Sequence, residues 1–222
     1  MEKRLDPEGK HKWSQNKNVI DPKYTCFPTA LITALEVVTD NDNYFDYLET
    51  YSEYDRVIDK LTYFMRNEPS CLELYKLYKP NEFKAWDEDK TKTKTKYSDK
   101  SYPPNEIWKV AIACFNLFLS LNKGDDFTPH AKISNLNFEE MKAEIDKGNS
   151  LVVSVKTPTI MGHMITVIGY SDKEFIVYDS YGLKDFQNYP AKNNATYIPF
   201  EDFKKYCKPV NSTTKMVAII NP

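Results

Sequence analysis

The chain has 222 residues, 41% hydrophobic and 14% aromatic, and its 30 Lys and Arg stand against 32 Asp and Glu. This composition supports a packed core, which excludes a disordered or collagen-like chain. A net charge of −2 provides no basic field for holding a nucleic acid, so we expect no nucleic-acid partner. The length fits one domain over residues 1–222.

The N-terminal residues and the apolar runs bear on localisation. The first twelve residues are polar and lack the apolar middle of a secretory signal. The longest apolar run, 110–121, is shorter than the roughly 20 residues that cross a bilayer. We therefore expect a cytoplasmic product with no membrane span and no Sec signal. Release by a non-Sec route or with a phage particle stays open.

The cysteines and histidines do not form a metal-binding pattern. Four cysteines occur without a CxxC pair, and the chain has only three histidines. We expect free thiols, no metal and no cofactor. His11 and His130 stand in polar segments, so we place them at the surface.

The first half of the chain has helical periodicity. After an irregular segment of about 25 residues, apolar residues recur at helical spacing from Cys26 to Val38, with Pro28 in the first turn. The same spacing returns over 54–65, 72–77 and 107–121, which predicts a helical insert at about 44–130. Pro103 and Pro104 precede the last of these helices.

A lysine-rich stretch separates two of these predicted helices. Residues 90–100 alternate Lys and Thr and contain no large aliphatic side chain. We predict a mobile loop that contacts substrate or partner, with a half-exposed strand as the alternative.

The second half changes to strand patterns. Asn137 is placed to cap a helix over 138–147, and Gly148 to end it. Strands are predicted at 151–155, 163–170, 175–180, 195–198 and 216–220, with a helix over 201–206 between the last two. Helices first and strands second indicate the α+β class with a C-terminal antiparallel sheet.

Cys26 is the candidate nucleophile. A thiol at a helix N-terminus lies beside unpaired N–H groups and the positive end of the helix dipole, which favour its thiolate form. The alternative is a small core residue, which is how we interpret the other three cysteines. Gln15, eleven positions earlier, could donate with the Cys26 backbone N–H to the oxyanion of a tetrahedral intermediate. A surface glutamine is the alternative.

His163 and Asp179 are the candidate base and orienting group. His163 follows Gly162 at the start of a strand, where an imidazole can act as general base and acid. If residues 170 and 174 flank a three-residue loop, Asp179 lies opposite Ile165 and on the same face as His163. A four-residue loop would move the aspartate to the other face. Asp179 could otherwise serve only the turn that follows it.

The order of these residues resembles a known family. SQNKN with Gln15, YTCFPTALITAL with Cys26, IDKGNSLVVSV, GHMITVIGY with His163, and VYDSYG with Asp179 before IPFEDF resemble papain-fold cysteine peptidases. The resemblance is to their bacteriocin-leader-peptidase-like, or double-glycine-peptidase-like, branch. It covers roughly 13–38 and 136–220 and leaves the insert unmatched.

The resemblance implies a role for each matched residue. Cys26 would be the nucleophile, His163 the base and acid, Asp179 the orienting group and Gln15 the oxyanion donor. Members usually carry a small or polar residue after the cysteine, whereas this chain has Phe27. We therefore expect Phe27 to line the mouth of a substrate cleft, together with Gly162.

These observations predict a papain-like cysteine peptidase that cleaves a peptide or isopeptide bond through an acyl-enzyme. Its substrate would be a peptide or protein, with bacterial cell-wall peptides among the candidates. Leader removal is a poor guess, because members that process leaders are fused to membrane transporters. Two alternatives stay open: transglutaminase-like acyl transfer to an amine, and a decayed peptidase scaffold that binds a partner or has a structural role.

Overall fold

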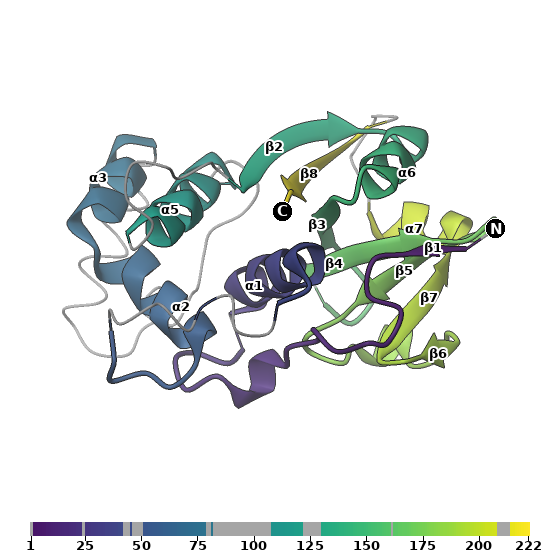
Figure 1. The fold of residues 1–222 in the computed structure, drawn as a ribbon, viewed down its shortest axis with the longest axis horizontal. Coiled ribbons are helices and arrows are strands. Elements are labelled where there is room, and N and C mark those ends of the chain that lie inside the picture. The colour runs from purple at the N-terminus through teal and green to yellow at the C-terminus, as the bar shows by residue number, and fades with distance from the viewer. Residues whose placement is uncertain are drawn as a thin grey trace.

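The structure is a computed structural model that describes residues 2–23, 25–41, 45, 51–78, 81, 108–121, 130–160, 162–207 and 214–222. One half is helical and the other is a sheet, and helix α1 (Cys26–Thr39) lies between them (Figure 1). The predicted α+β class is confirmed. No helix in these ranges is both long and apolar enough to cross a membrane.

The helical half is built from α1, α2 (Val57–Asn67), α3 (Pro69–Tyr78) and α5 (Trp108–Ser120). Their apolar faces share one core, in which Leu31, Leu61 and Phe118 are fully buried. The helical spacing in the sequence therefore located these helices. Pro103, Pro104 and the lysine-rich stretch 90–100 lie outside the described residues.

The sheet is antiparallel throughout, with strand order β2-β8-β3-β4-β5-β7-β6. The short strand β1 pairs with the C-terminal end of β4, at Gly169 and Tyr170. Its strands are β1 (Lys3–Arg4), β2 (Ala131–Leu136), β3 (Ser150–Val155), β4 (His163–Tyr170), β5 (Glu174–Tyr178), β6 (Ala191–Lys192), β7 (Ala195–Pro199) and β8 (Lys215–Ile220). The patterns predicted β3, β4, β5, β7 and β8, and missed β2 and the two-residue strands β1 and β6.

Helices cover both faces of the sheet. On one face, Thr166 Oγ1 donates to the Ala30 carbonyl of α1 (3.1 Å), and Ser150 Oγ to the Ala34 carbonyl (2.9 Å). On the other face, α6 (Phe138–Asp146) and α7 (Phe200–Tyr206) enclose the second apolar cluster. Asn137 caps α6 in a reciprocal box with Glu140, as its position predicted.

The β4–β5 hairpin has the predicted register near Asp179, although its loop and strand differ from the prediction. Tyr170 pairs with Phe175, so the loop has four residues, but a bulge between Val167 and Gly169 shifts the register back by one. Val167 then pairs with Val177, as a three-residue loop without a bulge would give. Asp179, which directly follows β5, therefore lies on the predicted face of the sheet.

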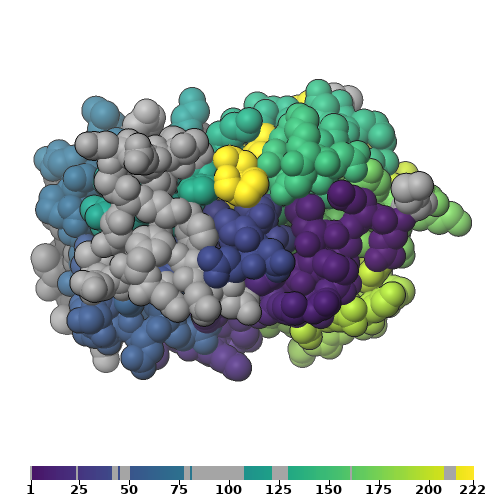
Figure 2. Space-filling view, in the orientation of Figure 1, coloured from purple at the N-terminus to yellow at the C-terminus, as the bar shows by residue number. Residues whose placement is uncertain are grey.

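The N-terminal segment lies on the surface against the β6–β7 turn (Figure 2). Arg4 donates to the Asn193 carbonyl (2.7 Å), and the Asn194 amide donates to the Gly9 carbonyl (2.9 Å). His11, at the end of this segment, is only 3% exposed, and its Nε2 lies 3.1 Å from Asp40 Oδ1. The expectation that His11 lies at the surface is wrong, because the segment packs against the end of α1.

Candidate active site

Three secondary-structure ends meet at one edge of the sheet. Strand β4 begins at His163 and β5 ends at Tyr178, and because the two strands are antiparallel, His163 and Asp179 lie at the same end. Helix α1 begins at Cys26. The hydrogen bonds from Thr166 and Ser150 hold α1 along the sheet, so that the N-terminus of the helix points toward His163.

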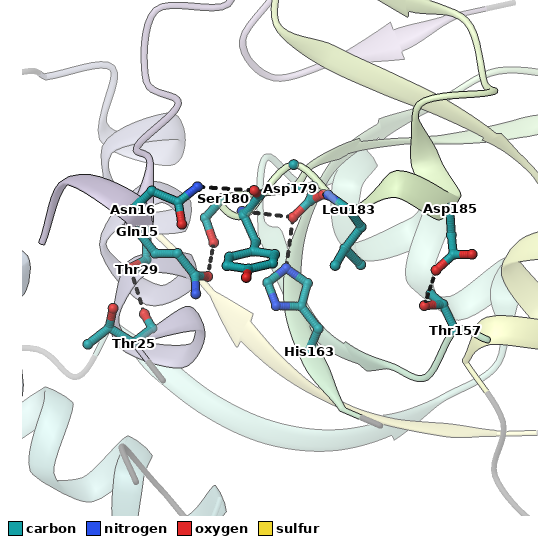
Figure 3. A network of polar contacts seen from close by, with 12 residues as sticks. Gln15, Asn16, Thr25, Thr29, Thr157, His163, Asp179, Ser180, Leu183 and Asp185 are labelled. Atoms are coloured by element: carbon teal, nitrogen blue, oxygen red, sulfur yellow. Dashed lines mark hydrogen bonds and ion pairs between the residues drawn. The ribbon is translucent and has the colours of Figure 1, made fainter. Parts of the chain in front are cut away.

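His163 and Asp179 form a buried pair. The His163 Nε2 lies 2.8 Å from Asp179 Oδ1, and both side chains are less than 5% exposed (2% and 4%). The carboxylate also accepts the backbone N–H groups of Tyr181 (2.9 Å) and Leu183 (Figure 3). Burial raises the pKa of Asp179, but these hydrogen bonds and the His163 charge outweigh it and lower that pKa. Asp179 therefore serves both the imidazole and the turn.

Cys26 interacts with the other side of this pair. Burial alone would lower the pKa of His163, but hydrogen bonds to Asp179 and Cys26, together with their charges, raise it to about 9. Because Nε2 faces Asp179, only Nδ1 is left to exchange a proton with the thiol. Cys26 is partly exposed, whereas the other three cysteines, Cys71, Cys114 and Cys207, are buried.

Gln15 is held in place at both ends of its amide. Its Oε1 accepts from Ser180 Oγ (2.8 Å) (Figure 3). Its Nε2 donates to the Pro22 carbonyl (2.9 Å). Its backbone N–H donates to the Ser180 carbonyl (3.1 Å). A primary amide has two N–H groups on its nitrogen, so one is left for a substrate oxygen.

A buried polar group joins the segment after Gln15 to the start of α1. The Asn18 amide donates to Thr25 Oγ1 (2.7 Å) and Thr29 Oγ1 (3.2 Å), and Thr29 Oγ1 donates to the Thr25 carbonyl (2.6 Å). Sequence reasoning missed Asn18 and Ser180. Ser180 carried no local signal, because it lies beyond the end of β5 and its role comes from its contact with Gln15.

The two residues assigned to substrate contact have different surroundings. Phe27 is 3% exposed, and its ring centroid lies 5.1 Å from that of Trp108. It packs in the core between α1 and α5, so the expectation that it lines a cleft mouth is wrong: successive residues of a helix point in different directions. Gly162 is exposed, and a Cβ added there would meet no atom within 4 Å. Tyr181, 39% exposed, lies beside the His163 ring (6.1 Å between centroids).

The arrangement has the parts of a thiol acyl-transfer site. It contains a thiol at a helix N-terminus, an imidazole in contact with it, a carboxylate that orients the imidazole, and an anchored amide. Within the described ranges, no three His, Cys, Asp or Glu side chains gather as metal ligands would.

Comparisons with known proteins address the family. No curated protein matches the chain significantly. Three chains among solved structures do. One of them, from Bacillus anthracis and provisionally described as a C39-like peptidase, is 12% identical, with a TM-score of 0.32. That match covers 49% of this chain and 58% of the other, so this chain spans less than two thirds of that protein.

The sequence model of the Peptidase_C39 like family matches residues 11–208, which include Gln15, Cys26, His163 and Asp179. This range is most of the 222 residues. The chain therefore belongs to the Peptidase_C39 like family, and the predicted papain-like fold is confirmed.

Proposed function

We propose that the chain is a cysteine peptidase that hydrolyses a peptide or isopeptide bond through Cys26, His163, Asp179 and Gln15. The observation that carries this proposal is the buried His163–Asp179 pair, 2.8 Å apart, in contact with a thiol at the N-terminus of α1. Family membership supports the reaction class.

In the first half of the reaction, Cys26 transfers its proton to Nδ1 of His163, and the thiolate attacks the carbonyl carbon. The new C–S bond forms as the carbonyl π electrons move to oxygen. The Gln15 amide and the Cys26 backbone N–H donate to that oxyanion. The C–N bond then breaks, the amine leaves with the Nδ1 proton, and a thioester remains on Cys26.

In the second half, His163 takes a proton from water as the hydroxide oxygen attacks the thioester carbonyl. The second tetrahedral intermediate collapses, the C–S bond breaks with its electron pair on sulfur, the Nδ1 proton returns to that sulfur, and the acid product leaves. Asp179 stays ionised and holds Nε2, so the ring keeps one orientation through both halves.

The substrate we propose is a peptide or protein, with peptide cross-links of bacterial cell walls among the candidates. Gly162 is exposed beside His163, and the space around its α-carbon is open. A substrate backbone could therefore approach the imidazole there without displacing a side chain.

The test combines labelling and turnover. Iodoacetamide at pH 6 followed by peptide mapping should modify Cys26 selectively, since the remaining thiols are buried. His163→Ala should slow the labelling of Cys26 at this pH, because no imidazole then takes the thiol proton, and Cys26→Ala should abolish hydrolysis of a mixed peptide library. His130→Ala, whose imidazole contacts the Asn221 carbonyl, is the matched control and should retain both.

Three outcomes separate the alternatives. Hydrolysis products that persist when an amine is added support the peptidase. Amide products that replace acid products under that condition assign acyl transfer instead. Equal labelling of all four thiols with no turnover would point to a binding or structural module on a decayed scaffold.

A further inference from the structure

Helix α2 contacts the segment that carries Gln15. We call residues 14–23 the oxyanion loop, since they begin beside Gln15 and end just before α1. Asp59, in the first turn of α2, is only 1% exposed. Its Oδ1 accepts the backbone N–H groups of Val19 (3.0 Å) and Ile20 (2.8 Å), and its Oδ2 also lies 3.2 Å from the Val19 nitrogen.

Two arginines of the same region extend this contact. Arg56 immediately precedes α2 and donates to the Ser14 carbonyl (3.1 Å), and its guanidinium lies 4.9 Å from the centre of the Trp13 ring. Arg66 in the last turn pairs with Asp21, with side chains 12% and 24% exposed. Asp59 is three positions after Arg56 and seven before Arg66, so one side of the helix presents all three.

The contacts continue from the loop to the proposed catalytic groups. The Gln15 amide donates to the carbonyl of Pro22, which follows the segment that Asp59 and Arg66 hold. Asn18, next to Val19, donates to Thr25 and Thr29 at the start of α1. The positions of Gln15 and of the Cys26 N–H therefore depend on a loop that is tied to α2.

We propose that α2 positions the oxyanion donors of the active site, with Asp59 as the main positioning residue. This inference rests on the proposed function. An oxyanion site stabilises a transition state only when its donors are already fixed where the charge develops. Asp59 fixes them by accepting two backbone N–H groups at once. The predicted helical insert is then a part of the catalytic apparatus.

The first experiment is a double-mutant cycle on kcat. Gln15→Ala should lower kcat by about 100-fold, the loss typical of removing an oxyanion donor. Asp59→Ala should lower kcat by about 10-fold with little change in KM, because the loop is displaced and not removed. If Asp59 acts through the oxyanion donors, Asp59→Ala should cost less in the Gln15→Ala background than in the wild type, because only the Cys26 N–H is then left to be misplaced. Fully multiplicative losses would overturn the proposal.

The second measurement separates positioning from loss of folding. Alkylation of Cys26 by iodoacetamide needs no oxyanion donor, so its rate and pH profile should be unchanged in Asp59→Ala. A parallel fall in alkylation and hydrolysis would mean a general structural defect and would count against the proposal. Asp55→Ala removes an exposed carboxylate just before the same helix and should leave kcat and alkylation unchanged.

Hydrogen exchange tests the positioning role of Asp59 without requiring turnover. In Asp59→Asn, which keeps the side-chain size but places an amide nitrogen against one of the N–H groups, exchange at Val19 and Ile20 should accelerate at least tenfold. Unchanged exchange would refute positioning by α2 even if the chain is an active peptidase. If the wild-type chain shows no turnover, the proposed function fails, while accelerated exchange would still show that Asp59 orders the loop.

Discussion

The Ser180 hydroxyl donates to Oε1 of Gln15 over 2.8 Å, and both residues are buried, at 8% and 1% exposure. Ser180 directly follows Asp179, so the turn that presents the carboxylate to His163 also anchors the amide. The His163–Asp179 pair and the Gln15 amide are thus coupled through two neighbouring residues, Asp179 and Ser180.

We expect Ser180→Ala to lower kcat by about 10-fold, because the Gln15 amide loses the hydrogen bond that sets its rotation. Ser180→Thr keeps a hydroxyl and should recover most of the rate. Steady-state kinetics on a cleaved peptide would check this. Equal rates for Ala and wild type would show that the Pro22 contact alone orients the amide.

The pH dependence should follow His163. Its pKa is raised to about 9 from an ordinary 6.5, so the stabilisation from its protonated form is complete below 6.5 and is lost as pH rises through about 9. Peptide hydrolysis should slow over the same upper range, because the imidazolium is the acid that protonates the leaving amine.

Asp179→Asn tests whether the carboxylate raises the His163 pKa. It removes the negative charge and the carboxylate hydrogen bond that help raise the His163 pKa, so the basic limb should move to lower pH. The measurement is kcat/KM for peptide hydrolysis from pH 5 to 10. A basic limb that does not move would mean that the carboxylate has no effect on the ring.

Phe27→Ala should act on stability. The ring is buried against Trp108, and deleting such a side chain costs about 3–5 kcal/mol of unfolding free energy. Urea unfolding would measure the loss. Val19→Ala, at a position 75% exposed, is the control and should change stability by less than about 0.5 kcal/mol. A stable Phe27→Ala with an altered KM would restore the cleft interpretation.

Gly169→Ala should destabilise the junction of β1 and β4. An added Cβ would lie 2.4 Å from the Lys3 carbonyl oxygen, so β1 must shift. We expect a loss of roughly 1–3 kcal/mol. Gly162→Ala adds the same methyl group into open space and should leave the unfolding midpoint unchanged. An unchanged midpoint for both variants would mean that β1 adjusts at no cost.

Strong local patterns predicted much of the fold. Helix α1 and strand β4 were predicted from apolar periodicity, together with Pro28 in the first turn of α1, and these signals depend only on neighbours in the sequence. Strand β2 was missed because AKISNL has few large apolar residues, and its partner β8 comes much later in the chain. An edge strand of this kind is specified by its partner more than by its own sequence.

The site residues also differ in how far the sequence could predict them. Cys26, His163 and Asp179 stand at ends of predicted elements, so their positions could be inferred, although their catalytic roles remain proposals. Asp59 and Ser180 could not be assigned, since their importance comes from contacts with Val19 and Gln15 across the fold. A carboxylate in a helix looks the same in sequence whether it faces water or two backbone N–H groups.

The bulge in β4 has a consequence for changes in chain length. The four-residue loop after Tyr170 and the extra residue before Gly169 offset each other, and Asp179 faces His163 only because both are present. Removing either irregularity alone would rotate the carboxylate to the far side of the sheet. Insertions and deletions in this hairpin should therefore preserve catalysis only in compensating pairs.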